Sequence, residues 1–273
     1  ICMPLIVVVV VIVLVYAFLV GSRRGGRMGR FQDCDYAHRG MYDNLRDMPE
    51  NSLLAFERAC THKLGIELDV RLSKDGVLVV FHDDTLERAC GDGRNVEDLT
   101  LCELQSLPLF GSDARIPTFA EALERIDGRV PLIVEIKHEE RYRESVQKTV
   151  EALRWYKGLY CIESFNPFAL RELRRIAPEI PRGQLAAGLA DSARDVGPLI
   201  GFALANLLTN CLSRPDFVAY DVNHMGAWQI WVQRRFFRTP IALWTIRTEE
   251  QAMETTGKGY IRICEWFEND ECA

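Results

Sequence analysis

Six short apolar runs divide the chain from residue 130 onward, and a polar or amphipathic stretch separates each run from the next. The runs are PLIVEIK (131–137), LYCIESF (159–165), RGQLAA (182–187), FVAYDV (217–222), IALWTI (241–246) and YIRIC (260–264). Their lengths and spacing predict buried strands that alternate with helices. This alternation is typical of a parallel sheet covered by helices.

Two more strands are predicted upstream, at YAHRG (36–40) and GIELDV (65–70). Between them, NSLLAFERACTHKLG reads as a helix that Asn51 caps and Gly65 ends. Eight strand and helix units indicate a closed (β/α)8 TIM barrel. A doubly wound open sheet is the alternative, although no GxGxxG follows any of the strands.

The stretch from 85 to 116 is too long for a minimal connection, so we expect an insertion that forms a small lid or subdomain near the site. Thr100 to Glu103 and Thr118 to Glu121 both fit the capping box that opens a helix. The helix after Thr118 is expected to be the regular barrel helix.

The first twenty residues contain no charge, which predicts a single transmembrane helix over residues 1–21. A basic, Gly-rich linker over 22–33 would then act as a flexible tether for a domain at 34–273. Four arginines in this linker predict a cell-membrane protein whose catalytic domain faces the cytoplasm. A cleaved signal peptide is the alternative, but it requires a basic start and a small-residue cleavage site.

Composition narrows the classes of function. A net charge of −6 offers no basic face for nucleic acid. Nine cysteines without any CxxC pair indicate free thiols in a reducing compartment, not a disulfide framework or a zinc ribbon. Composition does not indicate an oligomeric state.

Ionisable residues interrupt the predicted hairpin IELDVRLSKDGVLVVFHDDTL (66–86). If Asp75-Gly76 forms a two-residue turn, Asp69 lies opposite His82, and Glu67 lies opposite Asp84. Residues that face each other across a hairpin share one side of the sheet, so these four side chains would converge.

The same rim of the barrel collects further charged residues. His38 and Arg39 end one strand, and Glu135 and Lys137 end another, at the face where barrel enzymes keep their active sites. Three crowded carboxylates, from Glu67, Asp69 and Glu135, require a counter-charge. Oxygen ligands without a nearby cysteine cluster favour Mg²⁺ or Ca²⁺.

Two histidines beside such a metal suit the roles of general acid and general base. Arg39 and Lys137 add positive charge that suits phosphate oxygens. His38 and His82, with these cations, therefore indicate a phosphodiester-cleaving site. The alternative is a structural network of buried ion pairs, which also collects acids and histidines.

The motifs AHRG, PENSLLAF, IELDVRLSKDGVLVVFHDDTL, VEIK, ESF and LWTI occur in this order over about residues 34–265. With these motifs in this order, the chain resembles the glycerophosphodiester phosphodiesterase domain family, whose members form phospholipase-C-like phosphodiesterase barrels. The resemblance is to the membrane-anchored bacterial type in particular. The resemblance implies a TIM barrel with an inserted subdomain. It also implies hydrolysis of a small glycerophosphodiester to sn-glycerol 3-phosphate and an alcohol through a cyclic phosphate.

The resemblance also implies roles for individual residues. Glu67, Asp69 and Glu135 would bind the metal, and His38 and His82 would act as the general acid and base. Arg39 and Lys137 would bind the phosphate. Trp244 would contact the glycerol, and Glu50 would lie near the metal.

Two departures from the family pattern lie beside the expected glycerol pocket. Arg247 follows LWTI where the family commonly has Asn, and YIRICEWFEND replaces the usual ending GIITDFP. Arg247 is therefore a further candidate for a phosphate or head-group contact, as is His224 for substrate contact. Two alternative functions remain at this point: a lysophospholipase D that acts on single-chain lipids, and a catalytically silent, membrane-tethered metal-binding module.

Overall fold

The computed structural model describes residues 2–23, 26–137, 140–194 and 196–265. Its strands are β1 (Tyr36–His38), β2 (Gly65–Leu72), β3 (Leu78–Val80), β4 (Leu132–Ile136), β5 (Tyr160–Ser164), β6 (Arg182–Ala186), β7 (Phe217–Asp221), β8 (Ile241–Ile246) and β9 (Ile261–Cys264). Within these residues, eight parallel strands close into a barrel, because β1 pairs with both β9 and β2. The predicted (β/α)8 barrel is confirmed, and β3 pairs antiparallel with the end of β2.

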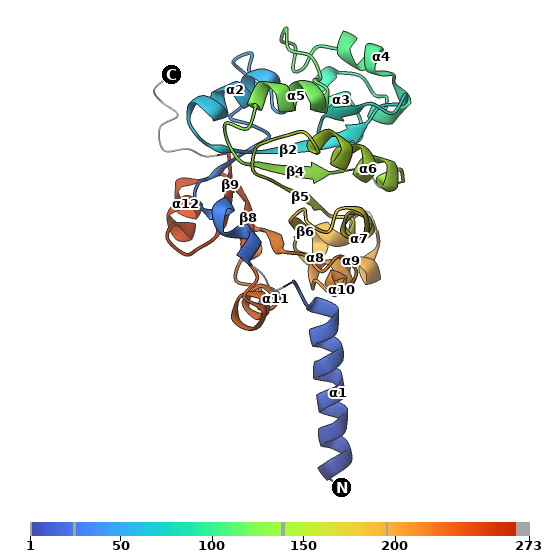
Figure 1. Cartoon of the computed structure of the whole chain (residues 1–273), viewed down its shortest axis with the longest axis vertical. Helices are drawn as coiled ribbons and strands as arrows, with labels where there is room; N and C mark the ends of the chain where they lie inside the picture. The colour runs from blue at the N-terminus through green and yellow to red at the C-terminus, as the bar shows by residue number, and fades with distance from the viewer. Residues whose placement is uncertain (1, 24–25, 138–139, 195, 266–273) are drawn as a thin grey trace.

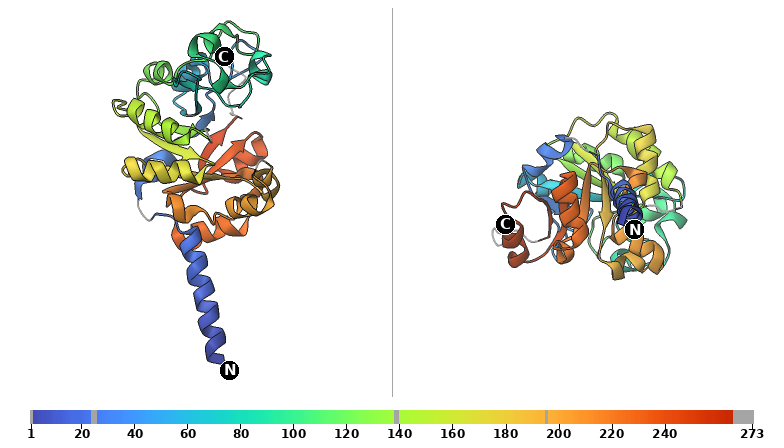
Figure 2. Two further views of the ribbon diagram at one scale, coloured as in Figure 1. Left: turned by 90° about the vertical axis from the view of Figure 1, so that its right-hand side faces the viewer. Right: turned by 90° about the horizontal axis from the view of Figure 1, so that it is seen from below.

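Helices surround this barrel (Figures 1 and 2). The longer ones are α1 (Cys2–Val20), α2 (Leu53–Thr61), α5 (Phe119–Ile126), α6 (Tyr142–Leu153), α7 (Pro167–Ile176), α9 (Pro198–Ala205) and α12 (Glu249–Thr255). The shorter helices and turns are η1 (Gly26–Gln32), α3 (Glu87–Cys90), η2 (Val96–Asp98), α4 (Leu101–Ser106), α8 (Leu189–Ala193), α10 (Asn210–Ser213), η3 (Val222–His224), α11 (Trp228–Val232) and η4 (Gln233–Phe237).

The inside of the barrel changes in chemistry along the strands. Alternate residues of a strand point to the same side. Ile133 and Cys161, near the starts of β4 and β5, belong to a buried apolar cluster inside the barrel. Glu135 and Glu163 follow them by two residues and are also buried, whereas Val134 packs outward in the cluster beneath the helices. The interior is therefore apolar at the amino ends of the strands and carboxylate-rich toward their carboxyl ends.

The turn between β2 and β3 is longer than predicted. Val70 pairs with Val80, and the backbone N–H of Ser73 donates to the carbonyl of Val77 at 2.9 Å. Three residues therefore form the loop, and Gly76 adopts the left-handed conformation with φ of 76°. A three-residue hairpin loop with a left-handed residue is a common alternative to the two-residue turn.

This longer turn shifts the register by one residue. The backbone N–H of Phe81 donates to the carbonyl of Asp69 at 3.0 Å, so Phe81 occupies the place predicted for His82. The predicted direct pairing of Asp69 with His82 is wrong, because a change of one residue moves side chains to the other side of a strand. The pairing of Glu67 with Asp84 is wrong for the same reason, and the Asp84 side chain is 83% exposed.

The segment after the hairpin packs on an apolar cluster of its own. Val79 of β3 and Leu86, Leu104 and Ile116 belong to this cluster, together with neighbouring side chains of α3 and α4. The capping boxes that begin at Thr100 and Thr118 are both present, as predicted. The chain between 85 and 116 thus forms a compact unit on one side of the barrel.

Helix α1 projects away from the barrel in both Figure 1 and Figure 2. No helix in the described residues combines the length and the apolar character that a membrane crossing requires. The predicted transmembrane anchor at residues 1–21 is therefore not supported.

The segment expected to be a tether is folded against the barrel where the structure describes it. Met28 and Phe31 of η1 are fully buried and join the apolar cluster inside the barrel. Arg23 and Arg27 donate hydrogen bonds to the carbonyl of Pro178 at 3.1 and 2.9 Å. The segment therefore contacts the barrel directly at these two arginines.

We expect Phe31→Ala to lower the free energy of unfolding by about 3–5 kcal/mol, because it leaves a cavity at the amino end of the barrel. Chemical denaturation followed by circular dichroism measures this change. Phe168→Ala is the matched control, since Phe168 is 51% exposed on α7 and its loss should cost less than about 1 kcal/mol. Equal stability of the two variants would show that η1 does not support the barrel.

Candidate active site

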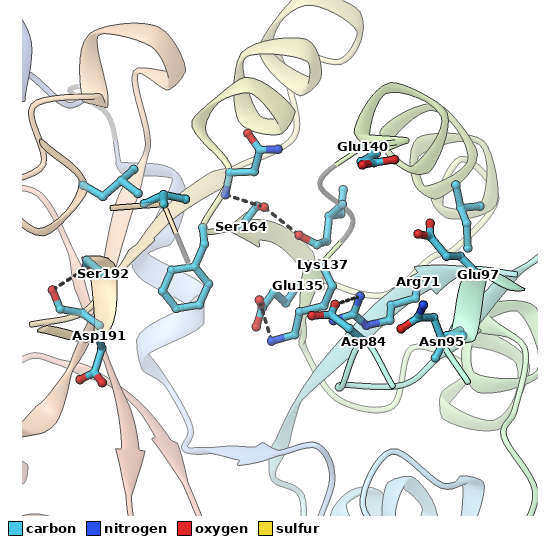
Figure 3. A pocket seen from close by; sticks show the side chains of 18 of the residues that line it. Arg71, Asp84, Asn95, Glu97, Glu135, Lys137, Glu140, Ser164, Asp191 and Ser192 are labelled. Atoms are coloured by element: carbon cyan, nitrogen blue, oxygen red, sulfur yellow. Dashed lines mark hydrogen bonds and ion pairs between the residues drawn. The ribbon is translucent and has the colours of Figure 1, made fainter. Parts of the chain in front are cut away.

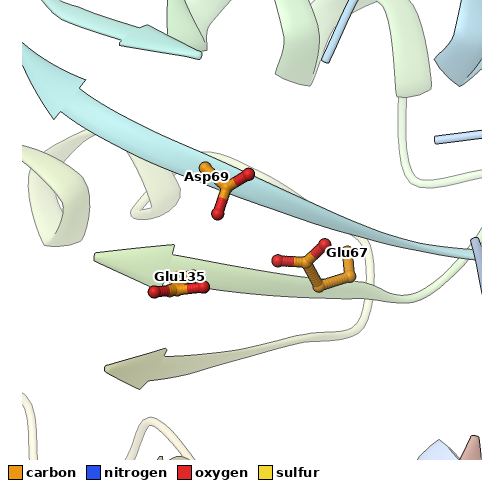
Figure 4. A group of neighbouring side chains, drawn as sticks. All are labelled: Glu67, Asp69 and Glu135. Carbon is orange, nitrogen blue, oxygen red and sulfur yellow. The ribbon is translucent and has the colours of Figure 1, made fainter. Parts of the chain in front are cut away.

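Three buried carboxylates lie together toward the carboxyl end of the barrel. Glu67 and Asp69 come from β2, and Glu135 of β4 is the direct register partner of Asp69. One oxygen atom of each side chain lies within 4.8 Å of the others. Figure 4 shows the three side chains on the two neighbouring strands. The predicted grouping of these acids is confirmed.

Burial and the charges of their neighbours shift the pKa values of these three carboxyl groups. Burial, and then the charges of Asp69 and Glu135, raise the pKa of Glu67 well above its usual range. Burial also raises the pKa of Glu135, against the opposing charge of Lys137. Burial acts on Asp69 in the same direction, but Lys137 and other cations outweigh it and hold the pKa of Asp69 well below its usual range.

This set of ligands fits a hard divalent cation. Buried carboxylates that repel one another are costly unless a positive charge lies between them. One oxygen of Asp69, Oδ1, accepts no hydrogen bond of good geometry from the described residues and has the Lys137 ammonium 3.2 Å away as an ionic neighbour. Carboxylate oxygens are the ligands that Mg²⁺ and Ca²⁺ prefer. Glu67, Asp69 and Glu135 can thus hold such an ion.

Lys137 supplies a fixed positive charge beside these acids. Its Nζ lies 2.8 Å from Glu135 Oε1 and 3.2 Å from Asp69 Oδ1, and its side chain is 12% exposed. Burial lowers the pKa of Lys137, but the two carboxylates outweigh it and raise the pKa above its usual value. The amine therefore stays protonated where β4 ends, as a phosphate-binding role requires.

The loop after β1 gives the acids two further partners. The side-chain amide of Asn51 donates to Asp69 Oδ2 at 2.8 Å, and the backbone N–H of Arg39 donates to Glu67 Oε2 at 3.0 Å. Asn51 was expected to cap α2, but Ser52 does so by accepting from the N–H of Ala55. Either residue is a good cap, so the sequence did not reveal the role of Asn51.

Arg39 and Glu50 belong to an ion-pair network at the edge of this acid group. Arg39 Nη1 lies 2.6 Å from Glu50 Oε1, and Arg88 Nη2 lies 2.7 Å from the same oxygen. The Nε of Arg39 is 3.6 Å from Asp69 Oδ2. Glu50 is buried but is paired with two arginines, so it is not one of the three grouped acids in the described residues.

His38 ends β1 and faces the acids. Its Nε2 lies 3.9 Å from Glu67 Oε2, and its Nδ1 lies 2.7 Å from Glu265 Oε1. Burial lowers the pKa of His38 to about 4, although Glu265 acts in the opposite direction. The ring is therefore neutral at physiological pH and has one nitrogen turned toward the acid group.

His82 follows β3 and is also held at Nδ1, which lies 2.5 Å from Asp83 Oδ1. Asp83 in turn accepts from Arg88 Nε at 2.6 Å. The pKa values of Asp69 and Glu135 are both lowered by the nearby charge of His82, although burial and Lys137 have the larger effects. The contact between Asp83 and His82 was not predicted from the sequence.

An open cavity of about 590 Å³ adjoins the acid group at Glu135 and Lys137 (Figure 3). Trp244 also lines this cavity. Trp244 packs edge to face against Phe165, with ring centroids 5.6 Å apart. Its buried indole N–H has no acceptor among the described residues. Trp244 thus has a free donor next to the cavity, which fits the predicted glycerol contact.

Two further candidates lie elsewhere. Arg247 donates from Nε and Nη2 to the Glu265 carboxylate, at 2.7 and 3.1 Å, so its guanidinium already has a carboxylate partner. The His224 ring is about half exposed and contacts Asp221 at 3.2 Å. Among the described residues that line the cavity, neither Arg247 nor His224 is included.

Sequence analysis also missed a fourth buried carboxyl. Glu163 is the register partner of Glu135 on β5 and is 1% exposed. Burial, and then the charge of Glu135, raise its pKa well above its usual value. The ESF motif contained this residue, but nothing in the local pattern showed that it points into the barrel beside the other acids.

A model of the glycerophosphoryl diester phosphodiesterase family matches residues 38–255, which is most of the chain and includes the acid group and both histidines. This chain belongs to that family. Membership places it among the phosphoric diester hydrolases.

Individual relatives agree with this assignment. A glycerophosphodiester phosphodiesterase of Caldanaerobacter subterraneus is 38% identical over 160 residues, which cover 55% of this chain and 65% of that protein. A lysophospholipase D of Rattus norvegicus is 33% identical over 142 residues, covering 47% of this chain and 43% of that protein. The structure of an Oleispira antarctica phosphodiesterase with its product sn-glycerol-3-phosphate has a TM-score of 0.71 and 26% identity, and covers 87% of this chain and 94% of that one.

We expect Asp69→Asn to weaken Mg²⁺ or Ca²⁺ binding at least tenfold, measured by titration calorimetry, because it removes one of three charged ligands. Binding by the wild type should be tighter at pH 8 than at pH 6, because the raised pKa of Glu67 lets a proton compete with the metal at low pH. Asp84→Asn is the control, since its exposed carboxylate pairs with Arg71. Equal loss in both variants would refute this ligand set.

Proposed function

We propose that the protein hydrolyses small glycerophosphodiesters to sn-glycerol 3-phosphate and an alcohol, with Mg²⁺ or Ca²⁺ held by Glu67, Asp69 and Glu135. The observation that carries this proposal is the buried acid group, which His38 faces and which an open cavity adjoins. When bound, such a cation supplies positive charge that stabilises the phosphoryl oxygens during displacement.

In this proposal His38 and His82 move the protons. One imidazole takes the proton of the substrate's glycerol 2-hydroxyl, whose oxygen then attacks phosphorus in line and forms a cyclic phosphate. The other imidazole protonates the oxygen of the departing alcohol. Water then opens the ring, and the two histidines exchange roles. The neutral state of His38 supports its use as a proton acceptor.

Two other residues would hold the substrate. The ammonium group of Lys137 lies at the cavity and would bind phosphate oxygens, with Arg39 adding positive charge behind the acid group. The free indole N–H of Trp244 would donate to a glycerol hydroxyl. The positive charges of Lys137 and Arg39 and the indole N–H of Trp244 are therefore suited to bind a substrate in which a phosphate is joined to a small polyol.

We expect the purified protein to release sn-glycerol 3-phosphate from glycerophosphocholine, and a chelator to abolish this turnover. His38→Ala and His82→Ala should each lower kcat at least about 100-fold, the usual loss when a general acid or base is removed. His62→Ala is the control, because His62 lies on the surface after α2. Binding of metal without hydrolysis of any diester would instead favour a catalytically silent metal-binding module.

Hydrolysis of lysophospholipids is a second candidate, because the cavity has an apolar wall. Leu204 of α9 lines the cavity, and Ile200, one turn earlier on the same side of the helix, is 54% exposed. Leu199 and Phe202 are 83% and 49% exposed. A helix that is apolar on all sides is normally covered. An acyl chain that extends from the cavity along α9 would cover this wall.

Short-chain lysophosphatidylcholines, used below their micelle-forming concentrations, test this second candidate. We expect kcat/KM to rise about tenfold from four to eight acyl carbons, because each methylene buries apolar surface on α9. Ile200→Gln should abolish this rise and leave turnover of glycerophosphocholine unchanged. Leu54→Gln is the matched control, at 53% exposure on α2. Turnover of glycerophosphocholine without any dependence on chain length would exclude the lysophospholipase activity.

A further inference from the structure

Glu265 is brought to the site by the closure of the barrel. It follows β9, and its backbone N–H donates to the carbonyl of Ile246 at the end of β8 at 2.8 Å. Because β9 also pairs with β1, the Glu265 side chain comes close to the last residue of β1, His38. The Glu265 side chain is 19% exposed, so it lies mostly within the rim of the barrel.

The Glu265 carboxylate joins one histidine to one arginine. Its Oε1 lies 2.7 Å from His38 Nδ1. Arg247 donates from Nε to Oε2 at 2.7 Å and from Nη2 to Oε1 at 3.1 Å. Burial favours the neutral acid, but the contacts with His38 and with the Arg247 cation outweigh it and lower the pKa of Glu265 to about 2. The group is therefore ionised at neutral pH.

An ionised carboxylate can only accept hydrogen bonds. The bond to Glu265 therefore requires that His38 carry its proton on Nδ1. In a neutral ring the lone pair then lies on Nε2, the nitrogen that faces Glu67 at 3.9 Å. The bond thus selects the tautomer in which the site-facing nitrogen can accept a proton.

We propose that Glu265 is a positioning residue that holds His38 in its Nδ1–H tautomer, and that the forked contact from Arg247 holds Glu265 in place. The kinetic part of this inference rests on the proposed function, because it concerns a proton that His38 takes from the substrate. The tautomer itself is a property of the folded protein and can be observed without turnover.

The second histidine supports the same reading. His82 Nδ1 is held by Asp83, which accepts from Arg88. Each histidine is therefore oriented by a carboxylate that is itself fixed by an arginine. Partners of this kind typically change activity or metal affinity by about 10–100-fold when they are removed.

The kinetic test compares three variants with glycerophosphocholine as substrate and Mg²⁺ or Ca²⁺ present. Glu265→Ala should lower kcat by about 10–100-fold and change KM less than threefold, because it disturbs a proton transfer and not the binding of substrate. Arg247→Met should lower kcat by about three- to tenfold, and it should fold normally because its side chain is 55% exposed. Glu172→Ala is the matched control, since Glu172 is 11% exposed and pairs with Arg175 on α7.

The spectroscopic test uses protein labelled with ¹⁵N at histidine, with the signal of His38 identified from the spectrum of His38→Ala. The wild type should show His38 protonated at Nδ1 and unprotonated at Nε2. In Glu265→Ala the ring should shift toward the Nε2–H tautomer, whereas Glu172→Ala should match the wild type. Metal affinity, measured by calorimetry, should stay within about threefold of the wild type in every variant.

Each outcome decides the proposal. A His38 ring that keeps its Nδ1 proton in Glu265→Ala would overturn it, as would a loss of kcat matched by an equal loss of metal affinity. If the wild type hydrolysed no diester, the proposed function would fail, and the tautomer measurement alone would decide the role of Glu265. A shifted tautomer with a selective loss of kcat would establish it.

Discussion

Repulsion among three buried carboxylates is the constraint around which this end of the barrel is organised. Glu67, Asp69 and Glu135 lie too close together to be ionised without positive charge or hydrogen-bond donors nearby. Lys137 supplies a charge, and Asn51 supplies a side-chain amide. These two partners contact Asp69, but its Oδ1 atom accepts no hydrogen bond of good geometry from the described residues. The arrangement is consistent with a site for a divalent cation.

The barrel can place charge there because it keeps apolar packing at its other end. Phe31 of η1 fills the amino end together with residues such as Ile133, so the carboxylates are not required to fill space at the centre of the fold. Stability and chemistry are thereby separated along the same strands.

Each histidine is held at Nδ1 by a carboxylate. Glu265 reaches His38 from the far end of the chain, and Asp83 reaches His82 from the next residue in sequence. An arginine holds each of these carboxylates, Arg247 in one case and Arg88 in the other. A neutral imidazole must present the correct nitrogen to its substrate, and these pairs restrict which nitrogen that is.

The strand order, the capping boxes at Thr100 and Thr118, and the three grouped acids followed from sequence alone. Each depends on local alternation, or on residues at equivalent places in successive strands. The turn at Gly76 was misjudged by one residue, because two- and three-residue loops share the same turn residues. The membrane span predicted from the uncharged composition of residues 1–21 found no support among the helices of the described residues.

The sequence by itself determined the barrel and the identity of its acid group, because the alternation of apolar strands with amphipathic helices, and the order of these elements, can be recognised along the chain. Only the tertiary structure decided which partners those groups meet. Asn51 turned to Asp69 instead of capping a helix, and Glu265 met His38 because β9 closes on β1. Contacts between residues more than two hundred positions apart depend on the closure of the barrel, and no local pattern carries that information.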